Sequence, residues 1–334
     1  MTVELSLADA HDLAVRVLTA AGATESNARP VADAVVTAQA EGIHSHGLTW
    51  LTTFADHLRN GKVDGKAEPQ VTQVAPAGLS VDARAGFAHP AIVKGIERLI
   101  PLARETGVAA LSVKNSYNCL VVGHHVRRIA EAELVALGFV NSPKSIAPWG
   151  GTKAVFGTNP LAFACPRKDG APLVVDQSSS KVARSEIRLA QKEGREIPLG
   201  WALDAEGQPT TDADAAMAGT VLPYGDYKGY GIALMVDLMA GAMTGARFSH
   251  QADSFVGDEG GPPGTGQFFL AIDPGPLGGE EFAKRVDGLC SLILDEPGVQ
   301  LPGDKRLANL GKTGAGPLSI PKALFNDLQG RAKV

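Results

Sequence analysis

The chain of 334 residues has few cysteines, and no two of them lie close together in the sequence. Cys119, Cys165 and Cys290 form no C-x-x-C pair, so they predict neither a disulfide framework nor a zinc site. No group of His, Asp and Glu residues has metal-ligand spacing either, and we expect no bound metal. An odd number of separated thiols is typical of reduced cysteines, and we expect a cytoplasmic protein.

The chain also lacks an excess of positive charge, because 36 acidic residues outnumber 31 lysines and arginines and give a net charge of -5. No cluster of basic residues could follow a phosphate backbone, so nucleic acid is not an expected partner. No run of about 18 or more apolar residues occurs, which argues against a membrane span. The first residues, MTVELSLADAHDLA, are acidic and amphipathic, and we expect no signal peptide there.

Helices are expected at the beginning of the chain, and the pattern changes near residue 71. Ser6 is placed to cap a first helix, Thr24 or Ser26 to cap a second, and Gly61 to end a third. Further on, short apolar runs such as LSVDA, VAALSVKN, LVALGFVNS, LVVDQ and QFFLAIDP alternate with helical segments such as PAIVKGIERLIPLARETG. Buried strands that alternate with helices predict an α/β layer.

This α/β layer lacks the common nucleotide-binding and nucleophile motifs. No strand runs into G-x-G-x-x-G and then a helix with an acidic residue about 20 positions later. Neither the G-x-x-x-x-G-K-[ST] phosphate loop nor the G-x-S-x-G nucleophile turn occurs. Any nucleotide must therefore bind to a different scaffold.

The segment EGIHSHGL, residues 41–48, places two histidines around a serine where the second helix is expected to end. Histidine can give or take a proton near neutral pH, so the segment could be an acid/base device. It could also be an ordinary helix C-terminus, because histidine suits the helix dipole and glycine suits the cap. Taken alone, the segment favours the second interpretation.

Four further polar clusters lie between apolar segments. GTNP predicts a tight turn that could offer backbone donors and the Thr158 hydroxyl to a ligand. Asp176 follows a buried strand, at the strand end where α/β ligands usually bind. Lys228 and three glycines lie just ahead of an apolar helix and suit a phosphate. Lys305 and Arg306 follow a Pro-Gly turn, which is usually just a solvated turn, whereas GTNP and the glycine-rich segment at Lys228 could equally be ordinary connections.

The order of these motifs resembles that of the malate/L-lactate dehydrogenase family, a non-Rossmann group. HSHG, GTNPLAFACP, VVDQSSS, GDYKGYG and LPGDKR follow one another over roughly residues 5–325. The segment SEIRLAQKEGREIPLGWALDAEGQPTTD and the LPGDKR tail are most similar to those of Δ1-piperideine-2-carboxylate/Δ1-pyrroline-2-carboxylate reductases.

The resemblance implies a nicotinamide cofactor, a small-molecule substrate, and a homodimer with active sites near the subunit interface. It implies an α/β fold in which a central mixed β-sheet domain, residues 71–304, binds NAD(P). Helical segments from the two ends of the chain, residues 1–70 and 305–334, are expected to pack together as a second domain.

The resemblance also implies roles for individual residues. His46 falls on the catalytic histidine, with Ser45 beside it and Glu186 as an acidic partner of the pair. Lys305 and Arg306 could hold the 2′-phosphate of NADPH, which the similar imine reductases favour, although NADH is also possible. The cofactor-binding positions are Asn118, Cys119, Leu120, Val121, Val122, Thr158, Asp176, Gln177, Ser178, Tyr227, Lys228, Gly303, Asp304, Lys305 and Arg306.

The sequence departs from the family pattern in two ways. A histidine motif such as SHHF or NHFG is usual, but this chain has Tyr117 and Asn118 there, and histidines follow only about a turn and a half later. Trp50 stands where the family has an arginine suited to a substrate carboxylate. Lys144 could replace that arginine, or it could be a surface lysine. Thr158 is a further substrate-binding candidate.

Three functional hypotheses follow. The first is NAD(P)H-dependent reduction of Δ1-pyrroline-2-carboxylate or Δ1-piperideine-2-carboxylate to proline or pipecolate, with His46 as the proton donor. A cyclic imine is more basic than a ketone, so its reduction depends less on a second acid at the position of Asn118. The second hypothesis is a 2-hydroxy-acid dehydrogenase of the malate or lactate type. The third is a nucleotide-binding protein without catalytic activity.

Overall fold

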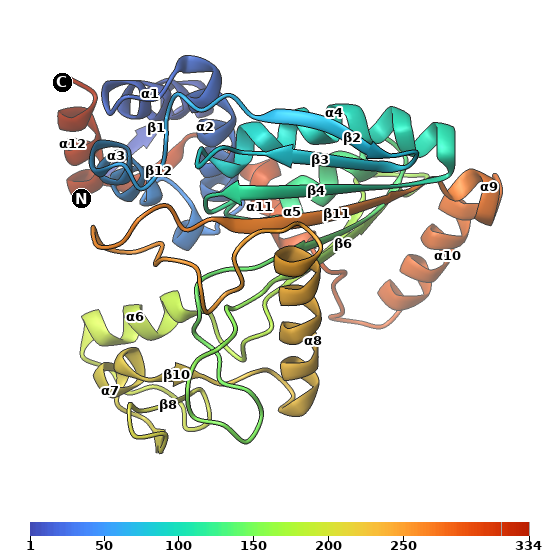
Figure 1. Ribbon diagram of the computed structural model, residues 1–334. Helices are drawn as coiled ribbons and strands as arrows, with labels where there is room; N and C mark the ends of the chain where they lie inside the picture. The colour runs from blue at the N-terminus through green and yellow to red at the C-terminus, as the bar shows by residue number, and fades with distance from the viewer. Residues whose placement is uncertain (315, 334) are drawn as a thin grey trace.

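The computed structural model describes residues 1–314 and 316–333, and its largest element is a seven-stranded mixed sheet (Figure 1). The strand order is β2-β3-β4-β11-β5-β6-β7. β3 and β4 are parallel, and the other neighbours are antiparallel. The strands are β2 (Gln70–Ala75), β3 (Gly78–Asp82), β4 (Val108–Ser116), β5 (Val135–Val140), β6 (Leu161–Cys165), β7 (Leu173–Gln177) and β11 (Thr265–Ile272). The predicted α/β fold with a central mixed sheet is confirmed.

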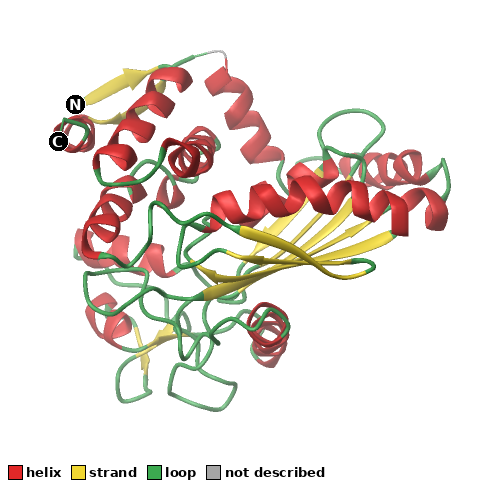
Figure 2. Ribbon diagram, turned by 45° about the horizontal axis from the view of Figure 1, so that its top comes forward, coloured by secondary structure: helices red, strands yellow, loops and turns green. Residues whose placement is uncertain are grey.

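Helices cover both faces of this sheet. Successive apolar side chains along a strand point to opposite faces, so each face has an apolar surface that packs on a helix. Leu111 and Phe269 point to the face that packs on α4 (Ala88–Thr106) and α5 (Val122–Ala130). Phe268, next to Phe269 in β11, points to the opposite face and packs on α8 (Tyr227–Asp237). Figure 2 shows the long helices on one side of the strands, and Figure 1 places α8 on the other side. Central strands that are buried on both faces explain their nearly continuous apolar sequence.

The two ends of the chain pack against each other, as the family resemblance implies. α1 (Leu7–Ala20), α2 (Glu25–Ala40), α3 (Trp50–Asn60) and α12 (Lys322–Arg331) share one apolar core. β1 (Thr2–Leu5) pairs antiparallel with β12 (Leu318–Pro321) and joins the termini (Figure 1). This two-stranded sheet was not predicted, because each strand is short and its partner lies at the other end of the chain. The domain boundaries remain a prediction.

The helix ends agree in part with the expected caps. The Ser6 hydroxyl accepts a hydrogen bond from the Asp9 N–H at the start of α1. Thr24 occupies the N-cap position of α2, but its side chain makes no capping bond there. Gly61 ends α3 with a left-handed φ of 81°, a conformation that glycine adopts without strain.

A small unit lies beyond β7, with its own apolar core around Ile187 and Val221. It contains a three-stranded sheet of two-residue strands, which is too short for alternation to predict. Its elements are α6 (Arg184–Glu193), β8 (Ala202–Leu203), β9 (Pro209–Thr210), α7 (Ala213–Ala218) and β10 (Thr220–Val221).

The remaining elements are the 3₁₀ turn η1 (His44–His46), the π-helical turn η2 (Leu238–Ala242), α9 (Pro274–Gly278), α10 (Phe282–Leu294) and α11 (Asp304–Gly314). Within residues 1–314 and 316–333, every helix is too short or too polar to span a lipid bilayer.

Candidate active site

The His-Ser-His segment forms a 3₁₀ turn that residues 41–43 separate from the end of α2. Gln39 holds this turn, since its side-chain nitrogen lies 2.8 Å from Nδ1 of His44 and its oxygen accepts the Leu48 N–H at 3.3 Å. Gly47 passes so close to Gln39 that any β-carbon would overlap the amide oxygen. The segment is therefore a helix ending whose geometry is specified, and His44 is used to fix it.

The half-buried His46 is oriented by its neighbours in the turn. The Ser45 hydroxyl lies 3.1 Å from His46 Nδ1, which leaves Nε2 as the nitrogen available to another molecule. The Trp50 indole N–H donates to the Ser45 carbonyl oxygen at 2.7 Å, and the Trp50 ring packs on Phe54. Trp50, predicted as a substrate-binding residue, thus also supports the turn.

Three elements that are distant in the sequence surround His46. Burial lowers the pKa of His46 below its usual 6.5, the nearby Asp176 carboxylate counteracts this, and the positive charges of Arg306 and His124 lower it further. These neighbours come from β7, from α11 and from α5. The predicted catalytic histidine therefore faces part of the predicted cofactor site.

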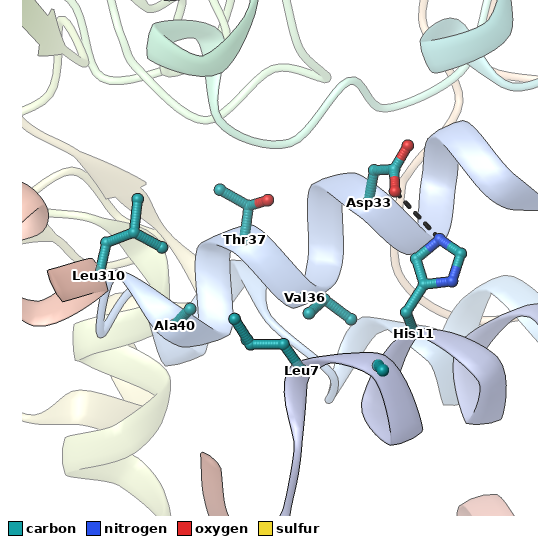
Figure 3. Close-up of a pocket in the computed structure, with 8 residues that line it drawn as sticks. Leu7, His11, Asp33, Val36, Thr37, Ala40 and Leu310 are labelled. Atoms are coloured by element: carbon teal, nitrogen blue, oxygen red, sulfur yellow. Dashed lines mark ion pairs between the residues drawn. The ribbon is translucent and has the colours of Figure 1, made fainter. Parts of the chain in front are cut away.

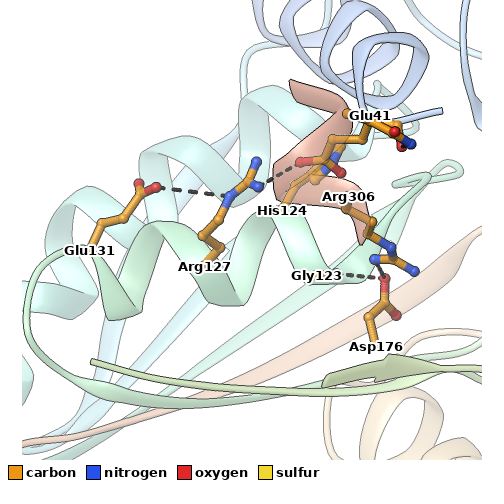
Figure 4. A network of polar contacts seen from close by, with 8 residues as sticks. Glu41, Gly123, His124, Arg127, Glu131, Asp176 and Arg306 are labelled. Carbon is orange, nitrogen blue, oxygen red and sulfur yellow. Dashed lines mark hydrogen bonds and ion pairs between the residues drawn. The ribbon is translucent and has the colours of Figure 1, made fainter. Parts of the chain in front are cut away.

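Asp176 joins two of these elements at the end of β7 (Figure 4). Its Oδ2 accepts hydrogen bonds from the Gly123 N–H and from Arg306 Nη1, both at 3.1 Å. A β-carbon at Gly123 would lie only 3.0 Å from that oxygen, so glycine permits the close approach. Arg306 lies in the first turn of α11, which begins at Asp304, and not in the solvated turn that the sequence suggested. Asp176 and Arg306, from the predicted cofactor segments 176–178 and 303–306, thus converge beside Gly123, which directly follows the predicted segment 118–122.

The loop between β4 and α5, residues 117–121, contains no histidine that could face His46. Tyr117 is buried, its hydroxyl bonds to Nδ1 of His57, and burial raises the pKa of its phenol. The Asn118 side chain accepts the Leu120 N–H at 2.9 Å, in a turn where Leu120 has a left-handed φ of 57°. Nε2 of His125 lies 3.1 Å from the Cys119 carbonyl oxygen, and burial lowers the pKa of this imidazole to about 4.

Thr158 and Ser178 lie next to the beginning of α8. The Ser179 N–H donates to the Thr158 carbonyl at 2.7 Å, and the Tyr224 N–H donates to the Ser179 carbonyl at 3.0 Å. α8 starts at Tyr227, so Lys228 belongs to its first turn rather than to the segment ahead of it. The side chains of Tyr227 and Lys228 are both exposed.

Two predicted residues are not joined to the others. Glu186 is exposed in the first turn of α6, and among the described residues its side chain makes no hydrogen bond to Ser45 or His46. Lys144 is also exposed, and its backbone N–H donates to Ser249 at 3.0 Å. Their roles remain predictions.

The sequence reasoning assigned no role to two buried acidic residues near the site. Glu41 is 2% exposed and contacts His124 and Arg127. Asp237 accepts hydrogen bonds from Asn141 at 3.1 Å and from the Ser249 hydroxyl at 2.7 Å. The sequence could have indicated both residues. Each is a single acidic residue beside apolar ones, and a carboxylate that is buried there needs polar partners.

A hollow between α1, α2 and α11 lies apart from these residues (Figure 3). Its walls are mostly apolar, and the only ion pair drawn within it joins His11 Nε2 and Asp33 Oδ1 at 3.0 Å. None of the predicted site residues lines it. A smaller cleft is lined by residues of the convergence, namely Glu41, Gly123, His124, Arg127, Pro172, Val174, Gly303, Arg306 and Leu307.

Comparison with known proteins gives consistent matches over the full chain. The family model for malate/L-lactate dehydrogenase matches residues 5–329. A (2R)-3-sulfolactate dehydrogenase (NADP(+)) of Chromohalobacter salexigens is 44% identical over 332 residues, which cover 99% of either chain. A Δ1-pyrroline-2-carboxylate reductase of Ancylobacter novellus is 39% identical over 98% of this chain and 97% of its own. The crystal structure of Δ1-piperideine-2-carboxylate reductase from Pseudomonas syringae pvar. tomato matches with a TM-score of 0.94 and 36% identity, over 99% of this chain and 100% of that one.

Proposed function

This chain belongs to the malate/L-lactate dehydrogenase family and is an oxidoreductase, and from that premise we propose that it reduces a cyclic imino acid with NADPH. The substrate is Δ1-pyrroline-2-carboxylate or Δ1-piperideine-2-carboxylate, and the product is proline or pipecolate. Relatives named as reductases of these two compounds support the substrate class.

The observation that carries the proposal is that His46 is the acid/base group at the convergence while the nearby loop supplies no second one. Tyr117 is buried against His57, and the Asn118 side chain closes its own turn. A ketone oxygen is weakly basic and needs a strong acid as the alkoxide develops, whereas an imine nitrogen is basic enough to take its proton from His46 before the hydride arrives. His124 also lines the cleft, but the Glu41 carboxylate holds its Nε2, so His46 is left as the proton donor and the site suits an imine better than a ketone.

The residues at the convergence fit a dinucleotide cofactor. The Gly123 N–H in the first turn of α5 and the Arg306 guanidinium both donate to one oxygen of Asp176, which leaves the other carboxylate oxygen to accept a hydrogen bond from a cofactor hydroxyl. Lys305 and Arg306 supply positive charge that a 2′-phosphate requires, which supports NADPH over NADH. Thr158, Gln177, Ser178, Tyr227 and Lys228 would complete the cofactor site.

In the proposed mechanism the bound nicotinamide supplies a hydride, and the side chains of this chain provide orientation and a proton. The Ser45 hydroxyl at Nδ1 sets the ring of His46 and directs Nε2 to the substrate nitrogen. Glu186 would act as the acidic partner of this pair. Trp50, Lys144 and Thr158 would contact the substrate, with Lys144 paired to its carboxylate.

A second candidate function is supported by the relative at 44% identity, which is named as a dehydrogenase of a 2-hydroxy acid. In that case His46 would accept a proton from the substrate hydroxyl in the oxidative direction. The same histidine and the same cofactor site would serve both reactions, so the substrate alone separates the two candidates.

We also propose that the protein is a homodimer. Side chains of α10 that include Leu289, Leu292 and Leu294 are exposed, as are Leu234 and Leu238 on and just after α8. Apolar surface of this extent on two helices supports association with a second copy.

A substrate panel tests the proposal. Wild-type enzyme is mixed with NADPH or NADH and, separately, with both cyclic imines, pyruvate plus methylamine, pyruvate, oxaloacetate and 3-sulfopyruvate, and nicotinamide absorbance is followed. We expect the highest kcat/KM for a cyclic imine with NADPH. A higher value for a 2-oxo acid would replace the proposal with the second candidate, and binding without turnover of any substrate would favour a protein without catalytic activity.

His46→Ala tests the proton donor. We expect kcat to fall by about 10²-fold or more, because a positioned general acid contributes ~10²–10⁴-fold. NADPH affinity measured by nicotinamide fluorescence serves as the control and should change little. Near-normal turnover with intact cofactor binding would show that another group donates the proton.

A further inference from the structure

Glu41 is a buried carboxylate at a junction of three helices. It is the C-cap residue of α2 and lies three positions before the first residue of the His44–His46 turn. Its Oε2 lies 2.9 Å from Nε2 of His124, and its Oε1 accepts a hydrogen bond from Arg127 Nη1 at 2.5 Å. Its carbonyl oxygen accepts the side-chain N–H of Asn309 in α11 at 3.0 Å. One residue thus ties the end of α2 to both α5 and α11.

These contacts continue into a closed chain of interactions around the cleft (Figure 4). From Glu41 they pass to His124 in α5, and the adjacent Gly123 donates its N–H to Asp176. Asp176 pairs with Arg306 of α11, and α11 returns to Glu41 through Asn309. The cleft wall that carries the proposed cofactor residues is therefore connected to the His-Ser-His turn through Glu41.

The charges at this junction are balanced in a way that keeps Glu41 ionised. Burial raises the pKa of the carboxyl, but the hydrogen bond and charge of His124 and those of Arg127 outweigh it and hold the pKa at about 2. A carboxylate that is both buried and bonded to two partners, here His124 and the Arg127 guanidinium, holds them in fixed positions, whereas an exposed ion pair does not.

We propose that Glu41 is a positioning residue of the active site. Glu41 fixes the end of α2, and with it the His44–His46 turn that follows, to α5 through its carboxylate and to α11 through its carbonyl oxygen, and so sets the position of His46 relative to the cofactor residues on α5, β7 and α11. This inference rests on the proposed function for the identity of the cofactor. Glu41 itself touches neither substrate nor cofactor and acts through His124, Arg127 and the turn.

The test compares Glu41→Gln with Glu131→Gln in the full-length protein. Gln keeps the length of Glu41 but removes its charge. Glu131 also contacts Arg127, at 3.8 Å, but it is exposed and lies on the far side of that guanidinium from the site (Figure 4), so it is a matched control. The readouts are the Kd of NADPH by nicotinamide fluorescence, kcat with the preferred substrate, and the melting temperature.

We expect Glu41→Gln to weaken NADPH binding by roughly fivefold or more and to lower kcat by about 10²-fold, since small displacements in an active site have effects of that size. Glu131→Gln should change both by less than about twofold. A folded Glu41→Gln variant with wild-type Kd and kcat, or a control with the same losses, overturns the proposal and leaves Glu41 a purely stabilising residue.

Asn309→Ala keeps the inference testable if Glu41→Gln does not fold. It removes the bond from α11 to the Glu41 carbonyl without leaving a buried charge unpaired, and we expect roughly a threefold or larger increase in the Kd of NADPH. An unchanged Kd overturns the proposal. If the wild-type protein binds NADPH but reduces no imine, the proposed substrate is wrong while the binding readout still decides the role of Glu41. A wild-type protein that binds neither nicotinamide cofactor overturns both.

Discussion

At the scale of single residues, the surroundings of His46 determine how it can act as an acid. Burial and the positive charges of Arg306 and His124 make the protonated imidazole less stable, while Asp176 stabilises it. A lowered pKa makes His46 a stronger proton donor but reduces the fraction that is protonated at neutral pH. The two members of the Asp176–Arg306 pair therefore act on His46 in opposite directions.

This opposition predicts how the pH profile of imine reduction changes in two variants. Reduction needs protonated His46, so kcat/KM should fall as the pH rises through the pKa of that residue. Arg306→Gln removes a charge that lowers this pKa and should move the inflection to higher pH. Asp176→Asn removes a charge that raises it and should move the inflection to lower pH.

The measurement is kcat/KM at saturating NADPH across the pH range in which the enzyme stays folded. The position of the inflection is the readout, because both residues also belong to the cofactor site and will alter the height of the profile. If the two inflections move in the same direction, or stay where they are, His46 is not the titrating acid.

At the scale of elements, α3 and the residues that follow it anchor the glycine-rich loop at 254–261. Lys62 is buried and donates to the carbonyl oxygens of Gly257 at 3.0 Å and Glu259 at 2.6 Å. Nε2 of His57 lies 2.9 Å from the same Gly257 oxygen. His57 also bonds to Tyr117, so this loop and the loop of Asn118 share one support. The glycine-rich loop is exposed, yet these contacts tie it down.

Lys62→Met should release this loop. Met fills a similar volume but donates no hydrogen bond, so the Glu259 carbonyl loses its partner at a cost of about 1–3 kcal/mol in the free energy of unfolding. We expect a lower urea midpoint and faster proteolysis within residues 254–261. Lys66→Met is the control, since Lys66 lies in the same segment with its side chain exposed. Equal effects of the two variants would mean that the carbonyl contacts do not hold the loop.

At the scale of the whole molecule, the two ends of the chain and the exposed apolar helices set the architecture. The pairing of β1 with β12 brings the termini together beside α1 and α12 (Figure 1). In α10 Cys290 is buried, and Leu289, Leu292, Ile293 and Leu294 are exposed. An isolated helix with this surface would be costly to expose to water, which supports the proposed homodimer.

The double variant Leu289→Asp/Leu292→Asp tests the dimer. Two charges on one face of α10 would have to be buried in an interface there, so we expect the variant to be a monomer in light scattering after gel filtration. Leu277→Asp is the control, because Leu277 is an exposed apolar residue in the neighbouring α9. A dimer of unchanged stability in the double variant would exclude this surface as the interface.

Much of the fold could be predicted because its elements have strong local patterns. The strands around LSVDA, VAALSVKN and QFFLAIDP and the helix α4 match the apolar periodicity of the chain. β1, β12 and the two-residue strands β8, β9 and β10 could not be predicted, since segments of that length carry almost no period. The start of α11 was missed for a similar reason, because Pro302 and Gly303 read as a turn and the helix begins directly after them.

Local sequence was enough to identify the types of chemistry that this protein contains. The His-Ser-His segment, the acid at the end of a strand and the basic residues after a Pro-Gly turn are each visible within a few positions, because motifs and periodicity depend on neighbours in the chain. Only the folded chain shows which of these groups meet. Glu41 and Arg127 are 86 positions apart and Asp176 and Arg306 are 130 apart, and contacts over such distances depend on how helices and sheet pack. Packing also explains why Tyr117, where the family resemblance implied a histidine motif, belongs to the core, since its ring lies against Phe54 and Phe87.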